Sequence, residues 1–158
     1  MAAKATVMTR AHTRQSSPVD GRACDGCTLC CKLLSIEELE KPPGATCPDC
    51  VAGTGCGIYA GRPTECRGFF CDYLLDPALG AEWQPTSSGM VVAYEDYSNS
   101  IVIHVDAGTP LAWRAEPFAS QIRGWATAGA RAETQVIVWQ GDTRIVIAPS
   151  APAIVEAI

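Results

Sequence analysis

The residues of this chain best suited to chemistry are its nine cysteines, all of which lie between positions 24 and 71. They begin with a regular pattern, because Cys24, Cys27 and Cys30 form C-x-x-C-x-x-C and Cys31 follows directly. A C-x-x-C turn can direct two thiolates at one ion, and two such turns complete a tetrahedral zinc site. Three cysteines at this spacing also occur in loops that bind a [4Fe–4S] cluster. The remaining cysteines are Cys47, Cys50, Cys56, Cys66 and Cys71.

The predicted ligand set consists of sulfur alone. The two histidines, His12 and His104, lie outside the stretch that holds the cysteines. Thiolates are soft ligands that select zinc, Cu(I) or iron–sulfur centres over magnesium and calcium. The sequence therefore predicts Zn²⁺ or iron, including an iron–sulfur cluster, and the spacing leaves the choice open. The predicted metal ligands are Cys24, Cys27, Cys30, Cys31, Cys47, Cys50, Cys56, Cys66 and Cys71.

The adjacent pair Cys30–Cys31 bears on the number of metal atoms. Side chains of neighbouring residues diverge, so two adjacent cysteines seldom bind the same mononuclear ion. One of the pair is expected to serve a first site, and the other to face a second site or to bridge two metals. Nine cysteines suffice for two four-cysteine sites with one to spare, and we expect more than one metal atom.

Three other uses of cysteine are weaker alternatives. Buried hydrophobic cysteines are common, but so dense a cluster is not typical of chance core use. A thioredoxin-like dithiol would follow a strand and precede a helix, whereas Cys47-x-x-Cys50 continues into a glycine-rich stretch. A disulfide scaffold is disfavoured by the odd count. Residues 1–21 also contain no apolar stretch of the signal-peptide type, so we expect a reducing, cytoplasmic location.

Other functional classes find little support. The formal net charge is −5 and the isoelectric point about 4.9, which disfavours nucleic acid as a partner. No apolar run approaches the roughly 20 residues of a membrane-spanning helix, so no membrane partner is expected. The glycines of Gly53-x-Gly55-x-Gly57 imitate a nucleotide loop, but they lie between cysteines, and we interpret them as tight turns. The sequence contains no catalytic constellation, and whether the chain is an enzyme stays open. The expected partner is a metal ion, with a protein partner left open.

The composition divides the chain into segments. Glycine and proline accompany the cysteines, and a stretch so poor in core residues needs another source of stability, such as bound metal. The predicted organisation is a flexible tail at 1–21, a cysteine-rich metal-binding module at 22–76, a linker at 77–88, a ββαββ lobe at 89–150 and a C-terminal tail at 151–158.

Short helices are expected within the cysteine-rich part. Ser35 and Glu38 fit a capping box, which predicts a helix over 36–40 that ends before the prolines at 42 and 43. Pro63 favours the start of a second helix. The small core of this part is predicted to come from Phe69, Phe70, Tyr73, Leu74 and Leu75.

The second half shows clearer patterns. Residues 90–95 and 100–106 are rich in β-formers and are separated by a turn. Phe118, Ile122 and Trp125 share one face of a helix predicted around 116–128, which Gly129 ends. Two further strands flank a turn at Gln140–Thr143. The predicted fold class is α+β: a small irregular cysteine-rich module plus an antiparallel ββαββ sheet lobe with one helix.

The cysteine motifs resemble a known family. "CDGCTLCC" followed by "GCGIYAGRPTECRGFFC" is similar to the bacterial CxxCxxCC cysteine-cluster family, described as a zinc- or iron-chelating domain (YkgJ-like). The resemblance covers residues 24–71. It implies framework roles for Tyr59, Arg62 and Pro63, and it fits Cys50 less specifically than the other cysteines. The ligands that it implies are Cys24, Cys27, Cys30, Cys31, Cys47, Cys56, Cys66 and Cys71.

Two functional hypotheses follow from these residues. The first is a metal-binding protein that holds zinc or iron through thiolates, as a chaperone, a buffer or a zinc-stabilised interaction module. The alternative is an iron–sulfur redox protein or an accessory subunit of a modifying enzyme. The family-like module also occurs attached to flagellin lysine methylases, but this chain offers no methyl-donor site, and that activity is not carried over.

Overall fold

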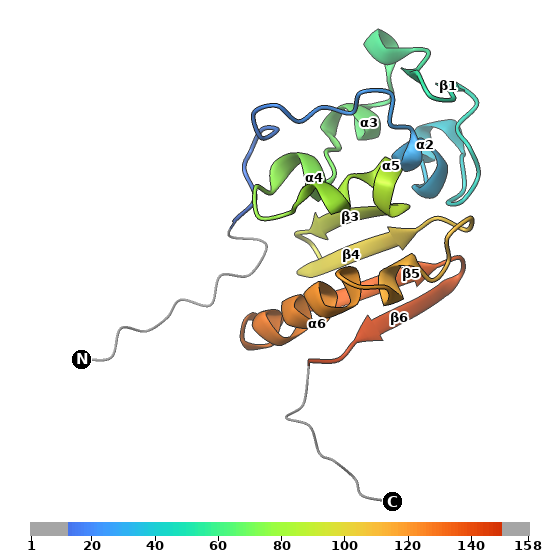
Figure 1. The fold of residues 1–158 in the computed structure, drawn as a ribbon. Coiled ribbons are helices and arrows are strands. Elements are labelled where there is room, and N and C mark those ends of the chain that lie inside the picture. Colours follow the sequence, from blue (N-terminus) through green and yellow to red (C-terminus); the bar gives the residue numbers. More distant parts are fainter. Residues whose placement is uncertain (1–12, 150–158) are drawn as a thin grey trace, which may run out of the picture.

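The computed structural model describes residues 13–149. The fold is α+β and is built on a four-stranded sheet in the order β3-β4-β5-β6. Its strands are β3 (Met90–Glu95), β4 (Ser100–Val105), β5 (Gln135–Gln140) and β6 (Thr143–Ile147). The one long helix, α6 (Phe118–Gly129), lies across β4, β5 and β6, while the short helices gather beyond β3 (Figure 1).

The sheet is mixed, and the predicted antiparallel arrangement is wrong for one pair of strands. The pairs β3–β4 and β5–β6 are antiparallel, as the two predicted hairpins require, but β4 and β5 run parallel. The reason lies in the long connection between them. This connection carries α6 across the sheet and returns the chain to the end at which β4 began, which is the usual way to join parallel strands.

The main core lies between α6 and the sheet. Alternate strand residues such as Ile101, Ile103 and Val138 point toward Ile122 and Ala126 of α6, and all five are almost fully buried. The stretch at 77–88, predicted as a linker, also contributes to this core. It forms η3 (Ala81–Trp83) and α5 (Pro85–Ser88), and Trp83 and Leu79 are 1% and 2% exposed.

Seven short elements make up the cysteine-rich segment, by which we mean residues 24–71, and the residues that follow it. They are α2 (Leu29–Leu33), η1 (Glu37–Leu39), β1 (Cys50–Val51), β2 (Gly55–Cys56), η2 (Tyr59–Gly61), α3 (Thr64–Gly68) and α4 (Asp72–Leu75). The strands β1 and β2 form a two-stranded antiparallel ladder. Of the core residues predicted for this part, Leu74 and Leu75 are buried, whereas Phe70 is 40% exposed.

The helix predicted at 36–40 is present only as η1, and the predicted capping box is wrong. The N-cap residue of η1 is Ile36, and it provides no side-chain cap. Instead, the carboxylate of Glu65 accepts hydrogen bonds from the N–H groups of Glu37 and Glu38, each at 3.2 Å. In return, Glu38 Oε1 accepts a 2.8 Å hydrogen bond from the N–H of Thr64. A glutamate of α3 thus caps η1, and a glutamate of η1 caps α3. These reciprocal hydrogen bonds connect the two halves of the cysteine-rich segment.

A second buried cluster joins the cysteine-rich segment to the sheet. Val91 of β3 packs against Leu33 of α2, Leu74 of α4 and Cys71, and all four are buried. Beside them, the fully buried carboxylate of Asp72 accepts a hydrogen bond from the N–H of Tyr94 and pairs with Arg14 at 2.7 Å. Helix α4 therefore lies along the outer edge of β3 and occupies part of that edge.

The chain before Cys24 is attached to α4 as well. Residues 1–12 of the predicted tail lie outside the described residues. Within the rest, the N–H groups of Gln15 and Val19 donate to the carbonyls of Leu75 and Leu74. The guanidinium of Arg22 donates to three further carbonyls, those of Tyr73, Asp76 and Leu79. The stretch of chain that leads into Cys24 is therefore held against α4. The predicted C-terminal tail at 151–158 lies outside the described residues.

Replacing Asp72 tests the attachment of α4. Asp72→Ala leaves Arg14 and the N–H of Tyr94 without their carboxylate partner, so we expect the free energy of unfolding to fall by about 3–5 kcal/mol. Asp20→Ala removes the same charge from an exposed position in the same part of the chain, and should change stability by less than about 0.5 kcal/mol. Urea denaturation followed by tryptophan fluorescence measures both, and equal effects would contradict the assignment.

Candidate metal centre

All nine cysteines are free thiols. Within residues 13–149, no three Cys, His, Asp or Glu side chains already converge in a way that would hold a metal ion. The cysteines nevertheless lie near one another in two groups, which we define by their common neighbours. The first group is Cys24, Cys27, Cys30 and Cys71; the second is Cys31, Cys47, Cys50, Cys56 and Cys66.

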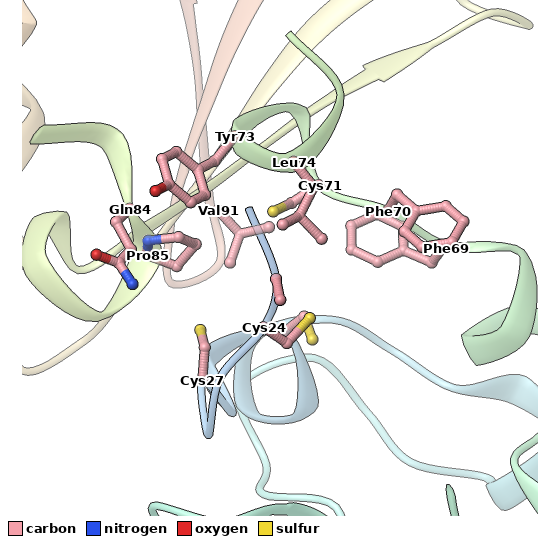
Figure 2. Close-up of a pocket in the computed structure, with 12 residues that line it drawn as sticks. Cys24, Cys27, Phe69, Phe70, Cys71, Tyr73, Leu74, Gln84, Pro85 and Val91 are labelled. Carbon is pink, nitrogen blue, oxygen red and sulfur yellow. The ribbon is translucent and has the colours of Figure 1, made fainter. Parts of the chain in front are cut away.

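The first group lines one apolar cavity of about 40 Å³. Cys24 and Cys27 come from the loop before α2, whose turn is closed by a 2.7 Å hydrogen bond from the N–H of Cys27 to the carbonyl of Cys24. Cys71 faces them from the other side of the cavity, next to Leu74 (Figure 2). The other walls of the cavity are mostly apolar and include Phe69, Phe70, Tyr73, Pro85 and Val91.

The surroundings of the first group disfavour ionisation of two of its thiols, those of Cys24 and Cys71. Burial is the main cause that raises the pKa of Cys71 to about 11, and the charges of Cys24 and Cys27 add to the effect. Burial also raises the pKa of Cys24, followed by the charges of Cys27 and Cys31. Arg62 acts in the opposite direction on Cys24. Ionisation of Cys24 and Cys71 is therefore disfavoured in the absence of a compensating cation.

The second group gathers around Cys31. The N–H of Cys47 donates to the carbonyl of Cys31 at 2.9 Å, which places the third C-x-x-C turn against α2. Cys50 pairs with Cys56 across the β1–β2 ladder. The pKa of Cys66 is raised by burial and then by the charges of Cys31, Cys47 and Cys56. Five thiols from α2, the β1–β2 hairpin and α3 thus share one electrostatic environment.

The adjacent cysteines of α2 belong to different groups. Cys30 lines the first cavity, whereas Cys31 is hydrogen-bonded to Cys50 of the second group. A hydrogen bond between the Cys30 and Cys31 thiols connects the groups. That hydrogen bond, followed by burial, raises the pKa of Cys31 far above its usual value. The two groups are therefore neighbours that meet at α2.

Glycines allow the cysteine loops to approach each other closely. Gly26 has a φ of +78°, and a Cβ at this position would lie 2.7 Å from the carbonyl oxygen of Gly53. Gly57 belongs to the turn around β1 and β2, where its N–H donates to the carbonyl of Asp49 at 2.7 Å. The glycines at 53, 55 and 57 therefore serve a tight hairpin, which is the turn role that the sequence predicts for them.

Two basic side chains accompany the cysteine groups. The guanidinium of Arg62 stacks on Tyr59, with 3.7 Å between its central carbon and the ring centroid. Its Nε is buried and has no hydrogen-bond partner within the described part of the chain. Lys41 is 6% exposed, although it stands between Glu40 and two prolines. The sequence gives no signal for burying Lys41, because a charged residue in such a polar turn is ordinarily exposed.

The one histidine among residues 13–149, His104, takes no part in the cysteine groups. His104 lies in β4, where burial lowers its pKa, and His12 is outside the described residues. The neighbouring Asp106 forms a 2.6 Å ion pair with Lys32, the residue after Cys31. This ion pair is a further tie between the cysteine-rich segment and the sheet.

Comparison of the chain with protein-family models, with curated proteins and with solved structures finds no match. The resemblance to the cysteine-cluster family therefore rests on the motif residues quoted for it. Among residues 13–149, no helix has both the length and the apolar character needed to cross a membrane.

The raised thiol pKa values predict a loss of stability at alkaline pH in metal-free, reduced protein. A thiol whose pKa is higher in the folded state, such as Cys71 at about 11 against 9.0, stabilises the fold fully below pH 9. This contribution disappears as the pH rises from about 9 to 11, because the unfolded chain ionises first. Urea denaturation across this range should show a steeper fall for the unmodified chain than for Cys71→Ala. Equal slopes would contradict the assignment.

Proposed function

We propose that this chain is a metal-binding protein whose cysteine thiolates hold zinc or iron, with more than one metal atom per chain. The observation that carries the proposal is the distribution of the thiols. Cysteines from distant parts of the sequence, Cys24 and Cys71 above all, face one small cavity, and four others surround Cys31. A reducing compartment is part of the proposal, since ligating thiols must remain unoxidised.

The chemistry of the two groups suits a soft cation. Each group offers at least four sulfur donors, and rotation about χ1 moves a cysteine sulfur without moving the backbone. Metal binding would bring the sulfurs together and displace the protons that burial now holds on them. A bound metal would supply the positive charge that the apolar walls lack, and its binding energy would add to the stability of a segment with a small core.

The size of the first cavity favours a single ion. The cavity is small, with a volume of about 40 Å³. A mononuclear ion such as Zn²⁺ fits a space of this size more readily than a cluster of four irons and four sulfides. Zinc bound by four cysteines is also the common structural form of such sites. We therefore place zinc before iron–sulfur for the first group.

The iron–sulfur alternative has its own support. The C-x-x-C-x-x-C spacing of Cys24, Cys27 and Cys30 is used by cluster-binding loops, in which a distant cysteine supplies the fourth ligand. Cys71 faces the same cavity and would be that distant ligand. A cluster here would favour a redox protein or an accessory subunit of a modifying enzyme.

Metal analysis of anaerobically purified protein separates these candidates. We expect colourless protein with about two zinc atoms per chain, one for each group. Cells with working cluster assembly should be the source, so that iron–sulfur loading is possible. Brown protein with stoichiometric iron and labile sulfide would replace zinc by the iron–sulfur alternative. Reduced, folded protein that binds neither metal would overturn the proposal.

Single cysteine replacements test the division into two groups. Cys27→Ser should remove about one metal atom, and Cys47→Ser about one other, because each change takes a ligand from only one group. The double variant should bind almost none. Each single variant is the control for the other, and tryptophan fluorescence reports whether the sheet remains folded.

A single change that releases all metal from protein whose sheet is still folded would contradict the division and indicate one shared centre. Unchanged metal content in both single variants would contradict the ligand assignment itself.

A further inference from the structure

Lys41 is a buried cation placed at the end of the helix that carries Cys30 and Cys31. Only 6% of the residue is exposed. Its ammonium donates hydrogen bonds to the carbonyls of Leu34, Pro42 and Lys32, the last two at 3.1 and 3.4 Å. The ammonium therefore has fixed acceptors around it and is held in one place.

The backbone directs Lys41 to this position. Ile36 and Lys41 exchange two hydrogen bonds of 3.0 Å, so that the chain folds back beneath α2 after the short turn of η1. The side chain then reaches the C-terminal end of α2, where the last carbonyls of a helix carry partial negative charge. A positive charge is stabilised at such a point, although it is removed from water.

The ammonium bonds to the carbonyl of Lys32, the residue after Cys31, and the thiols whose charges act on it belong mainly to the second group. The charges that act on Lys41 are those of Cys47, Cys31, Cys30 and Cys66, and three of these four cysteines are in the second group. Burial lowers the pKa of Lys41, and ionised thiols counteract that effect. In the described part of the chain, no carboxylate forms an ion pair with Lys41. Among the described residues, the hydrogen-bond partners of this buried ammonium are backbone carbonyls.

We propose that Lys41 is the built-in counter-charge of the second thiol group, a positioning residue that stabilises several thiolates held together around a metal. The inference rests on the proposed metal-binding function. Four thiolates around a divalent ion retain negative charge, and a nearby cation in a poorly solvated site offsets it. Lys41 binds no metal in this account; it acts through the charge of the ligands.

The expected effect is a selective loss of affinity. Lys41→Met removes the charge, and we expect it to weaken metal binding at the second group by about tenfold or more, with the first group almost unchanged. Lys41→Arg keeps a charge and should restore most of the affinity. Lys41→Gln is a second neutral variant that retains an N–H donor for the carbonyls, and it should resemble Lys41→Met.

Lys32→Met is the matched control, because it removes the same charge from a side chain that is 40% exposed and paired with Asp106. It should leave both affinities within about threefold of the unmodified chain. Titration of metal-free protein with zinc against a chelator measures the two affinities. The proposal is overturned if a folded neutral variant retains full affinity at the second group, or if the arginine variant binds no better than Lys41→Gln.

A second measurement tests the role of Lys41 in metal-free protein, independently of metal binding. The thiols of metal-free, folded protein react with an alkylating reagent as thiolates, and mass spectrometry assigns the rate to each cysteine. Lys41→Gln should slow alkylation of Cys31, Cys47 and Cys66 relative to Cys24 and Cys71. Equal slowing at all sites, or none, would contradict the role of Lys41. A chain that binds no metal but shows the selective slowing would contradict only the metal-binding proposal.

Discussion

The contact of Val91 with Leu33, Leu74 and Cys71 is the interaction on which the arrangement of the cysteines depends. Cys71 is buried in it, and Asp72, the next residue, is bonded to the edge of β3. Arg22, two residues before Cys24, is bonded to carbonyls in and after α4. The first and last cysteines of the chain thus face one cavity because the segments that carry them are fastened to the same side of the sheet.

Electrostatics sets the second constraint. Burial raises the pKa of Cys66 in the second group and of Cys71 in the first, so a metal-free fold disfavours ionisation of these two thiols. Two basic groups act on other thiols at particular points: the charge of Arg62 lowers the pKa of Cys24, and that of Lys41 lowers the pKa of Cys31. Of these two cations, Lys41 is buried, and Arg62 has a buried Nε.

Much of the sheet could be predicted from the sequence, because alternating apolar residues and the turn at Gly141 act locally. The parallel pairing of β4 and β5 could not, since it depends on how α6 packs after a long connection. The capping box at Ser35 failed for a similar reason: Glu65, distant in sequence, supplied better acceptors. The cysteine spacings predicted candidate ligands, but the division of the cysteines between two groups and the burial of Lys41 arise from tertiary contacts that no local pattern encodes.

X-ray absorption spectroscopy of the purified, metal-loaded protein tests the central claim most directly, because it reports the ligands of the bound metal. We predict a first shell of sulfur alone, about four atoms at roughly 2.3 Å if the metal is zinc. The spectrum should be the same in variants that change the two histidines. A first shell that contains nitrogen or oxygen from the protein would contradict an all-thiolate centre, and with it the role assigned here to the cysteine groups.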